Sequence, residues 1–257
     1  MPASVSLSTG TLYAFLLVLA RVGGALVFVP LPGLRSAPEP ARAALALGFT
    51  LALFPRWPAV TAGGVGTGQL IAWVLAESAL GIAVGVMVAL VLEALVLAAQ
   101  VLGLEAGYAY ASTIDPTTEA DSGVLLVFAQ LMAGLLFFAC GLDRQVLRLF
   151  AESLDRLPAG SFAPGPASAL AVVRLGAVLF SLGLRLAFPA VALLLMVDVA
   201  LALLGRINQQ LQLLSLAFPA KMLTALVVLG MVAAVFPRLL TQYAGQALTA
   251  ARRLLGS

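Results

Sequence analysis

Long apolar stretches alternate with short polar ones along this chain, and the lengths of the apolar stretches are unusual. Residues 124–142 have the length of one membrane-spanning helix, which needs about 20 residues. Residues 43–54 are too few for a span, whereas residues 70–104 and 169–204 are too many for one. These lengths predict long helices that bend or fold back as hairpins.

Proline residues interrupt the apolar pattern at four phenylalanine–proline steps. Proline lacks a backbone donor and tends to end or kink a helix, so each step predicts a helix end or a bend. The four steps are Phe54–Pro55, Phe188–Pro189, Phe218–Pro219 and Phe236–Pro237. Clusters of proline, glycine and serine predict loops near residues 31–42, 55–69, 106–123 and 143–167.

The composition places the chain in a membrane. Hydrophobic residues make up 62% of the 257 and charged residues 10%, whereas soluble domains are about half apolar and about a quarter charged. The net charge of +3 is spread thinly, which argues against a nucleic-acid partner. Histidine is absent from the sequence, which excludes zinc-protease motifs and histidine proton relays. With no nucleophile–base pair visible, the sequence predicts an all-α integral membrane protein in contact with lipid, with no enzymatic activity, cofactor or metal.

Charged residues occur inside the apolar stretches, where each costs about 2.5–3.5 kcal/mol at the bilayer centre. Pairing inside an assembly is the favoured interpretation. A transport path is the second, and would make the chain a small secondary transporter or ion channel that uses Glu77, Glu93 and Asp198. Location at a helix end, with the charge reaching water, is the third. The charges are Arg21, Glu77, Glu93, Arg174, Arg185 and Asp198.

The distribution of positive charge does not give a consistent topology. Arg35 and Arg42 indicate that the first loop is cytoplasmic, whereas the loop at 106–123 has no lysine or arginine. Simple alternation of spans reconciles these signals only if one long apolar stretch is a hairpin, or if the helices do not cross the bilayer one by one.

Residues 206–221, RINQQLQLLSLAFPAK, form a polar segment between two very apolar ones. Unpaired amide groups in hydrocarbon cost several kcal/mol each, so this segment belongs in water, at an interface or against another protein surface.

Four sequence segments, in this order and spacing, resemble the FliR family, the R subunit of the flagellar export gate with T-subunit homologues in injectisomes. The segments are LVLARVGGALVFVP at 17–30, GLEAGYAYASTIDP at 103–116, SLDRLPAG at 153–160, and RLAFPAVALLLMVDVALALLGRINQQ followed by LSLAFPAK. The resemblance covers nearly the whole chain, but it does not separate a flagellum from an injectisome.

The resemblance implies a non-enzymatic core subunit of a bacterial type III protein export gate, located in the inner membrane within the flagellar basal body. Its implied partners are FliP, FliQ, FlhB, FlhA and, transiently, unfolded export substrates. It also implies two parts built of long kinked helices and hairpins. Residues 1–182 are similar to the P subunit and contain the plug loop, and residues 183–257 are similar to the Q subunit, a helical hairpin, with a C-terminal tail.

Two functional segments are predicted on this basis. Residues 108–121 are predicted to plug the channel, because aromatic and apolar side chains exclude water from a pore. An ordinary extracytoplasmic loop is the alternative. The plug residues are Tyr108, Tyr110, Thr113, Ile114, Asp115 and Pro116. The hairpin tip is predicted to face the cytoplasm, and its residues are Arg206, Asn208, Gln209, Gln210, Pro219 and Lys221. Within the assembly, the charges predicted to pair are Arg21, Glu77, Glu93, Arg185 and Asp198.

Overall fold

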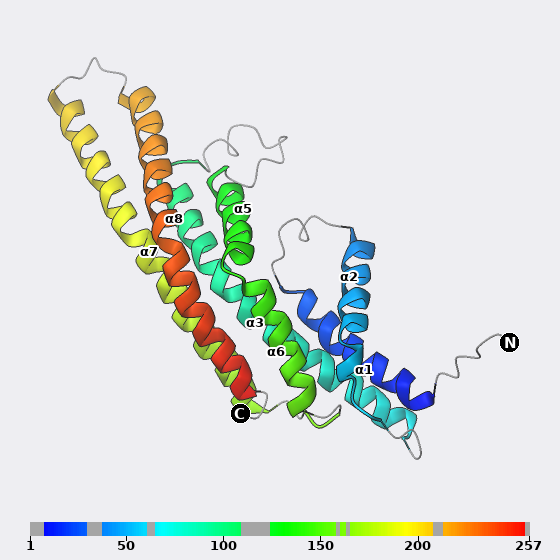
Figure 1. Cartoon of the computed structure of the whole chain (residues 1–257). Coiled ribbons are helices and arrows are strands. Elements are labelled where there is room, and N and C mark those ends of the chain that lie inside the picture. Colours follow the sequence, from blue (N-terminus) through cyan, green and yellow to red (C-terminus); the bar gives the residue numbers. More distant parts are fainter. Residues whose placement is uncertain are drawn as a thin grey trace. The chain divides into compact units, whose positions relative to one another are not determined.

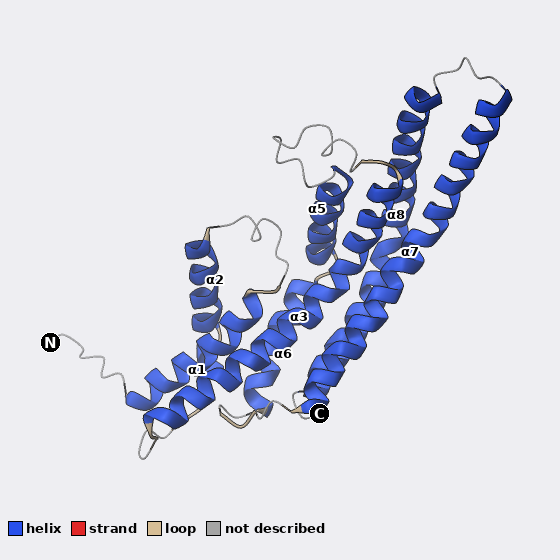
Figure 2. Ribbon diagram, turned by 180° about the vertical axis from the view of Figure 1, so that it is seen from behind, coloured by secondary structure: helices blue, strands red, loops and turns tan. Residues whose placement is uncertain are grey.

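The structure, a computed structural model, consists of helices over the part of the chain that it describes, which confirms the predicted all-α class (Figures 1 and 2). The described residues are 8–29, 38–60, 65–108, 124–157, 160–162, 165–207 and 213–254. The elements are α1 (Thr9–Leu26), α2 (Glu39–Ala52), the 3₁₀ turn η1 (Phe54–Arg56), α3 (Thr67–Glu105), α5 (Val124–Ala139), α6 (Leu142–Arg156), α7 (Pro166–Ile207) and α8 (Leu213–Leu254).

Local sequence signals mark several helix ends. The side chain of Ser8 caps α1 by accepting a hydrogen bond from the backbone N–H of Thr11, at 3.2 Å. Helix α2 carries Glu39 and Pro40 in its first turn, where a negative charge and a fixed φ both favour helix initiation. Gly141 adopts a left-handed conformation, with a φ of 65°, between α5 and α6.

Four helices are long and apolar enough to cross a membrane: α1, α3, α7 and α8. Helices α5 and α6 pass the same test only as a pair, and they are bent by 62° at the break between them. The described part of the chain therefore offers four candidate spans, or five if the bent pair is one span.

The two long apolar stretches, predicted to bend or to fold back as hairpins, each lie within one helix and do not fold back. Helix α3 runs for 39 residues and α7 for 42, about 60 Å each at 1.5 Å per residue. Pro189 lies inside α7, and Pro219 and Pro237 lie inside α8, so of the two predicted effects, a helix end or a bend, these three prolines do not cause a helix end. Membrane helices tolerate proline because neighbouring groups satisfy the freed backbone carbonyl.

The predicted loop at 143–167 is also wrong over its first half, because residues up to Arg156 form α6. The buried side chains of α6 recur every three or four residues and form one apolar stripe, while charged side chains occupy the other face. They are Leu142, Val146, Leu149, Phe150, Ser153 and Leu154.

The chain divides into two compact units. Unit 1 comprises Met1–Val91, Gly141–Gly176 and Tyr243–Ser257, and unit 2 comprises Leu92–Cys140 and Ala177–Gln242. These two units are defined by contacts within the chain. The division into P-like and Q-like parts rests instead on sequence resemblance, and it stays a prediction.

Unit 1 packs α1 along the first part of α3, with α2 and α6 against them (Figures 1 and 2). Val18 and Val22 of α1 form a buried cluster with Leu154 of α6. Trp57 packs on this cluster and donates a hydrogen bond from Nε1 to the carbonyl of Thr50, at 2.9 Å.

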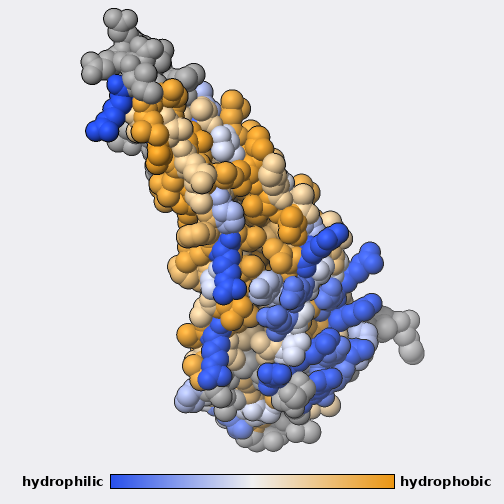
Figure 3. Space-filling model, turned by 90° about the vertical axis from the view of Figure 1, so that its left-hand side faces the viewer, coloured by the Kyte–Doolittle hydropathy of each residue, from blue (hydrophilic) through white to orange (hydrophobic). Residues whose placement is uncertain are grey.

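Unit 2 is a four-helix packing of α3, α5, α7 and α8 around small buried residues. The cluster consists of Ala99, Leu102, Ala106, Leu125, Ala129, Ala190, Leu194, Ala225 and Leu229. Alanine at many of these positions lets the helices approach closely, as is typical of membrane helix packing. Phe188 and Met196 of α7 and Leu223 and Met231 of α8 are exposed. The face shown in Figure 3 is largely apolar over its upper part.

Candidate functional site

A buried ion pair lies at the centre of unit 1. Arg21 of α1 donates a hydrogen bond from Nε to Oε2 of Glu77 on α3, at 2.5 Å. The two side chains are 2% and 1% exposed. Because the two charges neutralise each other, both side chains can stay buried inside the protein. A carboxylate that is bound in this way is poorly placed to carry ions.

The remaining polar atoms of this pair bind α6 and the residues that follow it. Arg21 donates from Nη1 to Oγ of Ser153, at 3.0 Å, and from Nη2 to the carbonyl of Leu157, at 3.3 Å. Oε1 of Glu77 accepts a hydrogen bond from the backbone N–H of Gly160, at 3.0 Å. We call these five residues the Arg21–Glu77 network. Among the described residues no buried side-chain nitrogen or oxygen lacks a partner.

Glycine residues bring the two backbones close enough for the network to form. A Cβ on Gly24 of α1 would lie 2.6 Å from the carbonyl oxygen of Ser78, and one on Gly81 of α3 would collide with the carbonyl of Arg21. Gly85 approaches the backbone of Ala25 in the same way. The Gly81-x-x-x-Gly85 pattern is therefore a helix-contact motif in this chain, as such motifs are in other membrane proteins.

Two further ion pairs connect α6 to other elements of unit 1, both at more exposed positions. Arg56 of η1 pairs with Asp155. Arg252 near the end of α8 pairs with Glu152, with 3.3 Å between Nε and Oε2. Exposed pairs of this kind contribute little to stability, on the order of 0–1 kcal/mol, but they fix which face of α6 points outwards.

Unit 2 has a different polar centre. Nζ of Lys221 on α8 donates to Oδ2 of Asp198 on α7, at 2.8 Å, and the two side chains are 15% and 41% exposed. The hydroxyl of Tyr108, just beyond α3, donates to the carbonyl of Met222 at 3.1 Å. Burial raises the pKa of Tyr108 above its usual 10.0, so the phenol stays protonated and remains a donor. These contacts tie α3, α7 and α8 together at one turn of α8.

The other predicted site residues are exposed or half-buried, or lie outside the described residues. Arg185 and Arg206 are exposed on α7, Pro219 is exposed inside α8, and Glu93 is half-buried on α3. Tyr110, Thr113, Ile114, Asp115 and Pro116 of the predicted plug lie outside the described residues, as do Asn208, Gln209 and Gln210 of the predicted tip.

The sequence reasoning missed the three α6-side members of the network: Ser153, Leu157 and Gly160. The signal was present in the 3.6-residue apolar period of 142–156, which predicts an amphipathic helix. A serine on the apolar face of such a helix indicates a buried hydrogen bond, since a buried hydroxyl without a partner is costly.

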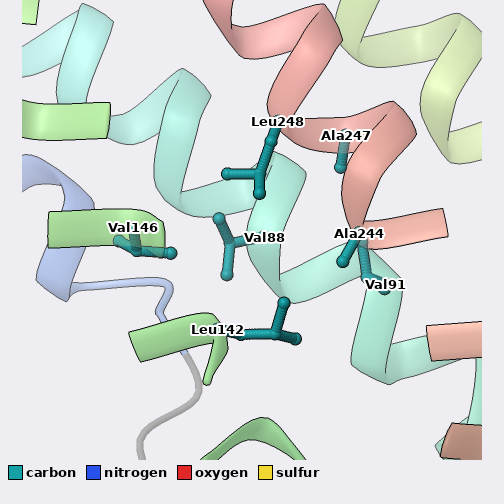
Figure 4. Close-up of a pocket in the computed structure, with 7 residues that line it drawn as sticks. All are labelled: Val88, Val91, Leu142, Val146, Ala244, Ala247 and Leu248. Atoms are coloured by element: carbon teal, nitrogen blue, oxygen red, sulfur yellow. The ribbon is translucent and has the colours of Figure 1, made fainter. Parts of the chain in front are cut away.

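An apolar gap of about 10 Å³ in unit 1 is lined by residues of α3, α6 and α8 (Figure 4). Figure 4 shows Val88, Leu142, Val146 and Leu248 turned towards one another around it. The space is about that of one water molecule and its lining offers no polar partner, so it has the character of a packing defect. No group of three or more metal-binding side chains occurs among the described residues.

Long apolar helices, a fully paired buried charge network and an exposed apolar hairpin together define an integral membrane protein built for close helix packing. A family model described as "Bacterial export proteins, family 1" matches residues 12–247, most of the chain. The chain belongs to this family.

Curated relatives agree over most of their length. The chain is 30% identical to the flagellar biosynthetic protein FliR of Escherichia coli (strain K12) over 220 residues, which cover 85% of this chain and 82% of the relative. It is 26% identical to the FliR of Caulobacter vibrioides, covering 85% and 88%, and 23% identical to that of Bacillus subtilis, covering 84% of each.

The family makes this chain a membrane protein of the flagellar export gate and not an enzyme, as the sequence predicted. It also places the chain among export proteins rather than among small secondary transporters, the alternative left open by the intramembrane carboxylates.

Proposed function

We propose that the chain is a channel-forming subunit that assembles with FliP and FliQ, lies next to FlhB and FlhA, and conducts unfolded flagellar proteins. The observation that supports this most directly is the exposure of α7. In its most apolar 18-residue window only 17% of the residues are buried within the chain, against 67% for α3. An apolar surface of this length requires lipid or other subunits to cover it.

Site-specific photocrosslinking in cells tests the proposal. A photoreactive amino acid at Phe188, which is 74% exposed, is expected to capture FliP or FliQ. The matched control is Phe236 on α8, which is fully buried and is expected to give no intermolecular product. If no exposed position on α7 or α8 captures either subunit while all three proteins are present, the assembly as proposed is wrong.

The plug prediction belongs to the same proposal. Tyr108 supports it, because its bond to Met222 fixes the chain to α8 at the point where the predicted plug begins. Deletion of residues 110–119 is expected to increase the leak of ions across the membrane in cells that assemble the gate. An unchanged membrane conductance would favour the ordinary extracytoplasmic loop.

The hairpin tip is proposed to face the cytoplasm next to FliQ and FlhB. The α7–α8 hairpin supports this, since its two helices flank residues 208–212 directly. A cysteine at position 210, with the native Cys140 replaced by alanine, is expected to crosslink to FliQ or FlhB. Labelling of position 210 only by a reagent confined to the periplasm would contradict the orientation.

The division at residue 182 also remains a proposal. Helix α7 runs from Pro166 to Ile207 and passes that position without a break, so a P-like and a Q-like part would be joined through one continuous helix.

A further inference from the structure

The Arg21–Glu77 network makes more contacts than charge neutralisation requires. An arginine and a carboxylate frequently pair side by side through two parallel hydrogen bonds. Here only Nε of Arg21 serves the carboxylate, while both terminal nitrogens reach Ser153 and Leu157. The second carboxylate oxygen likewise serves Gly160 instead of Arg21.

The acceptors and donors outside the ion pair all come from one short stretch of sequence. Arg21 binds the carbonyl of Leu157, the residue after α6, and Glu77 binds the N–H of Gly160, three residues later. The ion pair therefore holds this stretch at both ends. Ser153, one turn earlier, is also fixed to Phe150 through a hydrogen bond from Oγ to the carbonyl, at 2.7 Å.

Gly160 adds an independent constraint. Its φ is 82°, a backbone conformation that favours glycine, and a Cβ there would lie 2.6 Å from the ring of Trp73 on α3. The backbone at Gly160 thus lies against the tryptophan ring while its N–H binds Glu77 one helical turn further along α3. Helix α7 begins at Pro166, only six residues after Gly160.

We propose that Arg21 and Glu77 are positioning residues: together they clamp the start of the α6–α7 connection onto α1 and α3, and so fix the point from which α7 starts. The clamp is internal to unit 1, and nothing in it depends on which subunits surround the chain. An experiment that contradicts the clamp therefore leaves the proposed assembly with FliP and FliQ untouched, and the reverse is also true.

Limited trypsin digestion of the membrane-embedded, epitope-tagged chain tests the clamp. Arg156 is exposed, and the bond after it is followed directly by the Leu157 carbonyl that Arg21 holds. In Arg21→Lys the charge opposite Glu77 remains, but one ammonium group cannot reach three acceptors in the way a guanidinium does. Cleavage after Arg156 is expected to rise about tenfold, because a charged hydrogen bond to the connection is lost.

Ser153→Ala is the milder variant, which removes one acceptor and leaves the ion pair in place; a rise of about threefold is expected, in line with one lost hydrogen bond. Thr50→Ala is the matched control, since Thr50 is a buried hydroxyl of unit 1 whose Oγ1 binds only its own helix, at the carbonyl of Ala46. It is expected to leave cleavage unchanged.

Cleavage after Arg56 in η1 and after Arg253 near the end of α8 distinguishes a local clamp from general stability, because both residues are exposed and neither lies within the interior of a candidate span. The clamp predicts that these two sites stay at their natural rate while cleavage after Arg156 rises. An equal rise at all three sites, or no rise after Arg156 in Ser153→Ala and Arg21→Lys, would overturn the proposal.

Discussion

The Arg21–Glu77 network of unit 1 and the Asp198–Lys221 pair of unit 2 are both ion pairs between apolar helices, yet the chain encloses them very differently. In the first, both charged side chains are buried, and their remaining polar atoms are hydrogen-bonded to three other residues. The second is a single contact with Asp198 substantially open. Residues of unit 1 thus satisfy all polar atoms of the Arg21–Glu77 pair. In unit 2, by contrast, the chain leaves the carboxylate of Asp198 partly uncovered.

The same difference appears in the apolar surfaces. Helix α3 and helix α7 are similar in length and both strongly apolar, but the chain buries most of the apolar window of α3 and little of that of α7. Hydrophobicity alone therefore does not tell how much of a long apolar helix the chain itself buries.

The largest expected effect is that of Glu77→Ala, which leaves the charge of Arg21 buried and uncompensated. Breaking such a pair from one side costs about 3–5 kcal/mol. The chain is expected to disappear from the membrane fraction on an immunoblot, and swimming motility with it. The double variant Arg21→Met with Glu77→Met removes both charges and is expected to restore much of the protein level. Normal accumulation of Glu77→Ala alone would contradict a sealed network.

The next effect concerns two adjacent glycines on α1. Gly24→Ala places a methyl group against the Ser78 backbone and is expected to destabilise unit 1 by about 1–3 kcal/mol, as overpacking does. Gly23→Ala meets no atom within 4 Å and is expected to be neutral or stabilising by up to about 1 kcal/mol, because alanine favours helix. Thermal stability of the detergent-solubilised protein measures both; equal effects would rule out the close α1–α3 contact.

Asp198→Asn tests the open centre of unit 2 and is expected to cost no more than about 1 kcal/mol, since the pair is partly exposed. Glu77→Gln serves as the comparison and is expected to be clearly more harmful in the same thermal assay. If Asp198→Asn proves as harmful as Glu77→Gln within the assembled gate, then other subunits bury the pair, and the contrast between the two units exists only in the isolated chain.

The smallest effect is expected for Tyr108→Phe, which removes one hydrogen bond worth about 0.5–1.5 kcal/mol. Burial raises the pKa of Tyr108, so the unfolded chain loses this proton first as the pH rises. The stabilisation by the neutral phenol is therefore present below pH 10 and is lost above it. The difference in melting temperature between the natural chain and Tyr108→Phe should shrink between pH 9 and 11; a constant difference would contradict this.

The sequence predicted the helices and the partnered charges wherever one sequence feature, such as a long apolar stretch, was unambiguous. Apolar length predicted long apolar helices where α3, α5 and α7 lie, and charges such as Glu77 and Asp198 were recognised as needing partners. Each phenylalanine–proline step predicted a helix end or a bend, and at Pro189, Pro219 and Pro237 the helix continues, since neighbouring groups can satisfy the backbone carbonyl that proline leaves unbonded. Helix α6 was predicted as part of a loop because proline, glycine and serine are frequent at 157–165, directly after its apolar period.

By itself the sequence determined the class of protein, because a chain this apolar with so few charges is stable only in a membrane, and charges inside its spans require partners. Only the tertiary structure decided which partners they have. Arg21 and Glu77 are 56 residues apart and Arg21 and Ser153 are 132 apart, while Lys221 finds Asp198 across a hairpin. No periodicity encodes such distances, since they depend on how closely glycine lets α1 approach α3 and on where α6 packs.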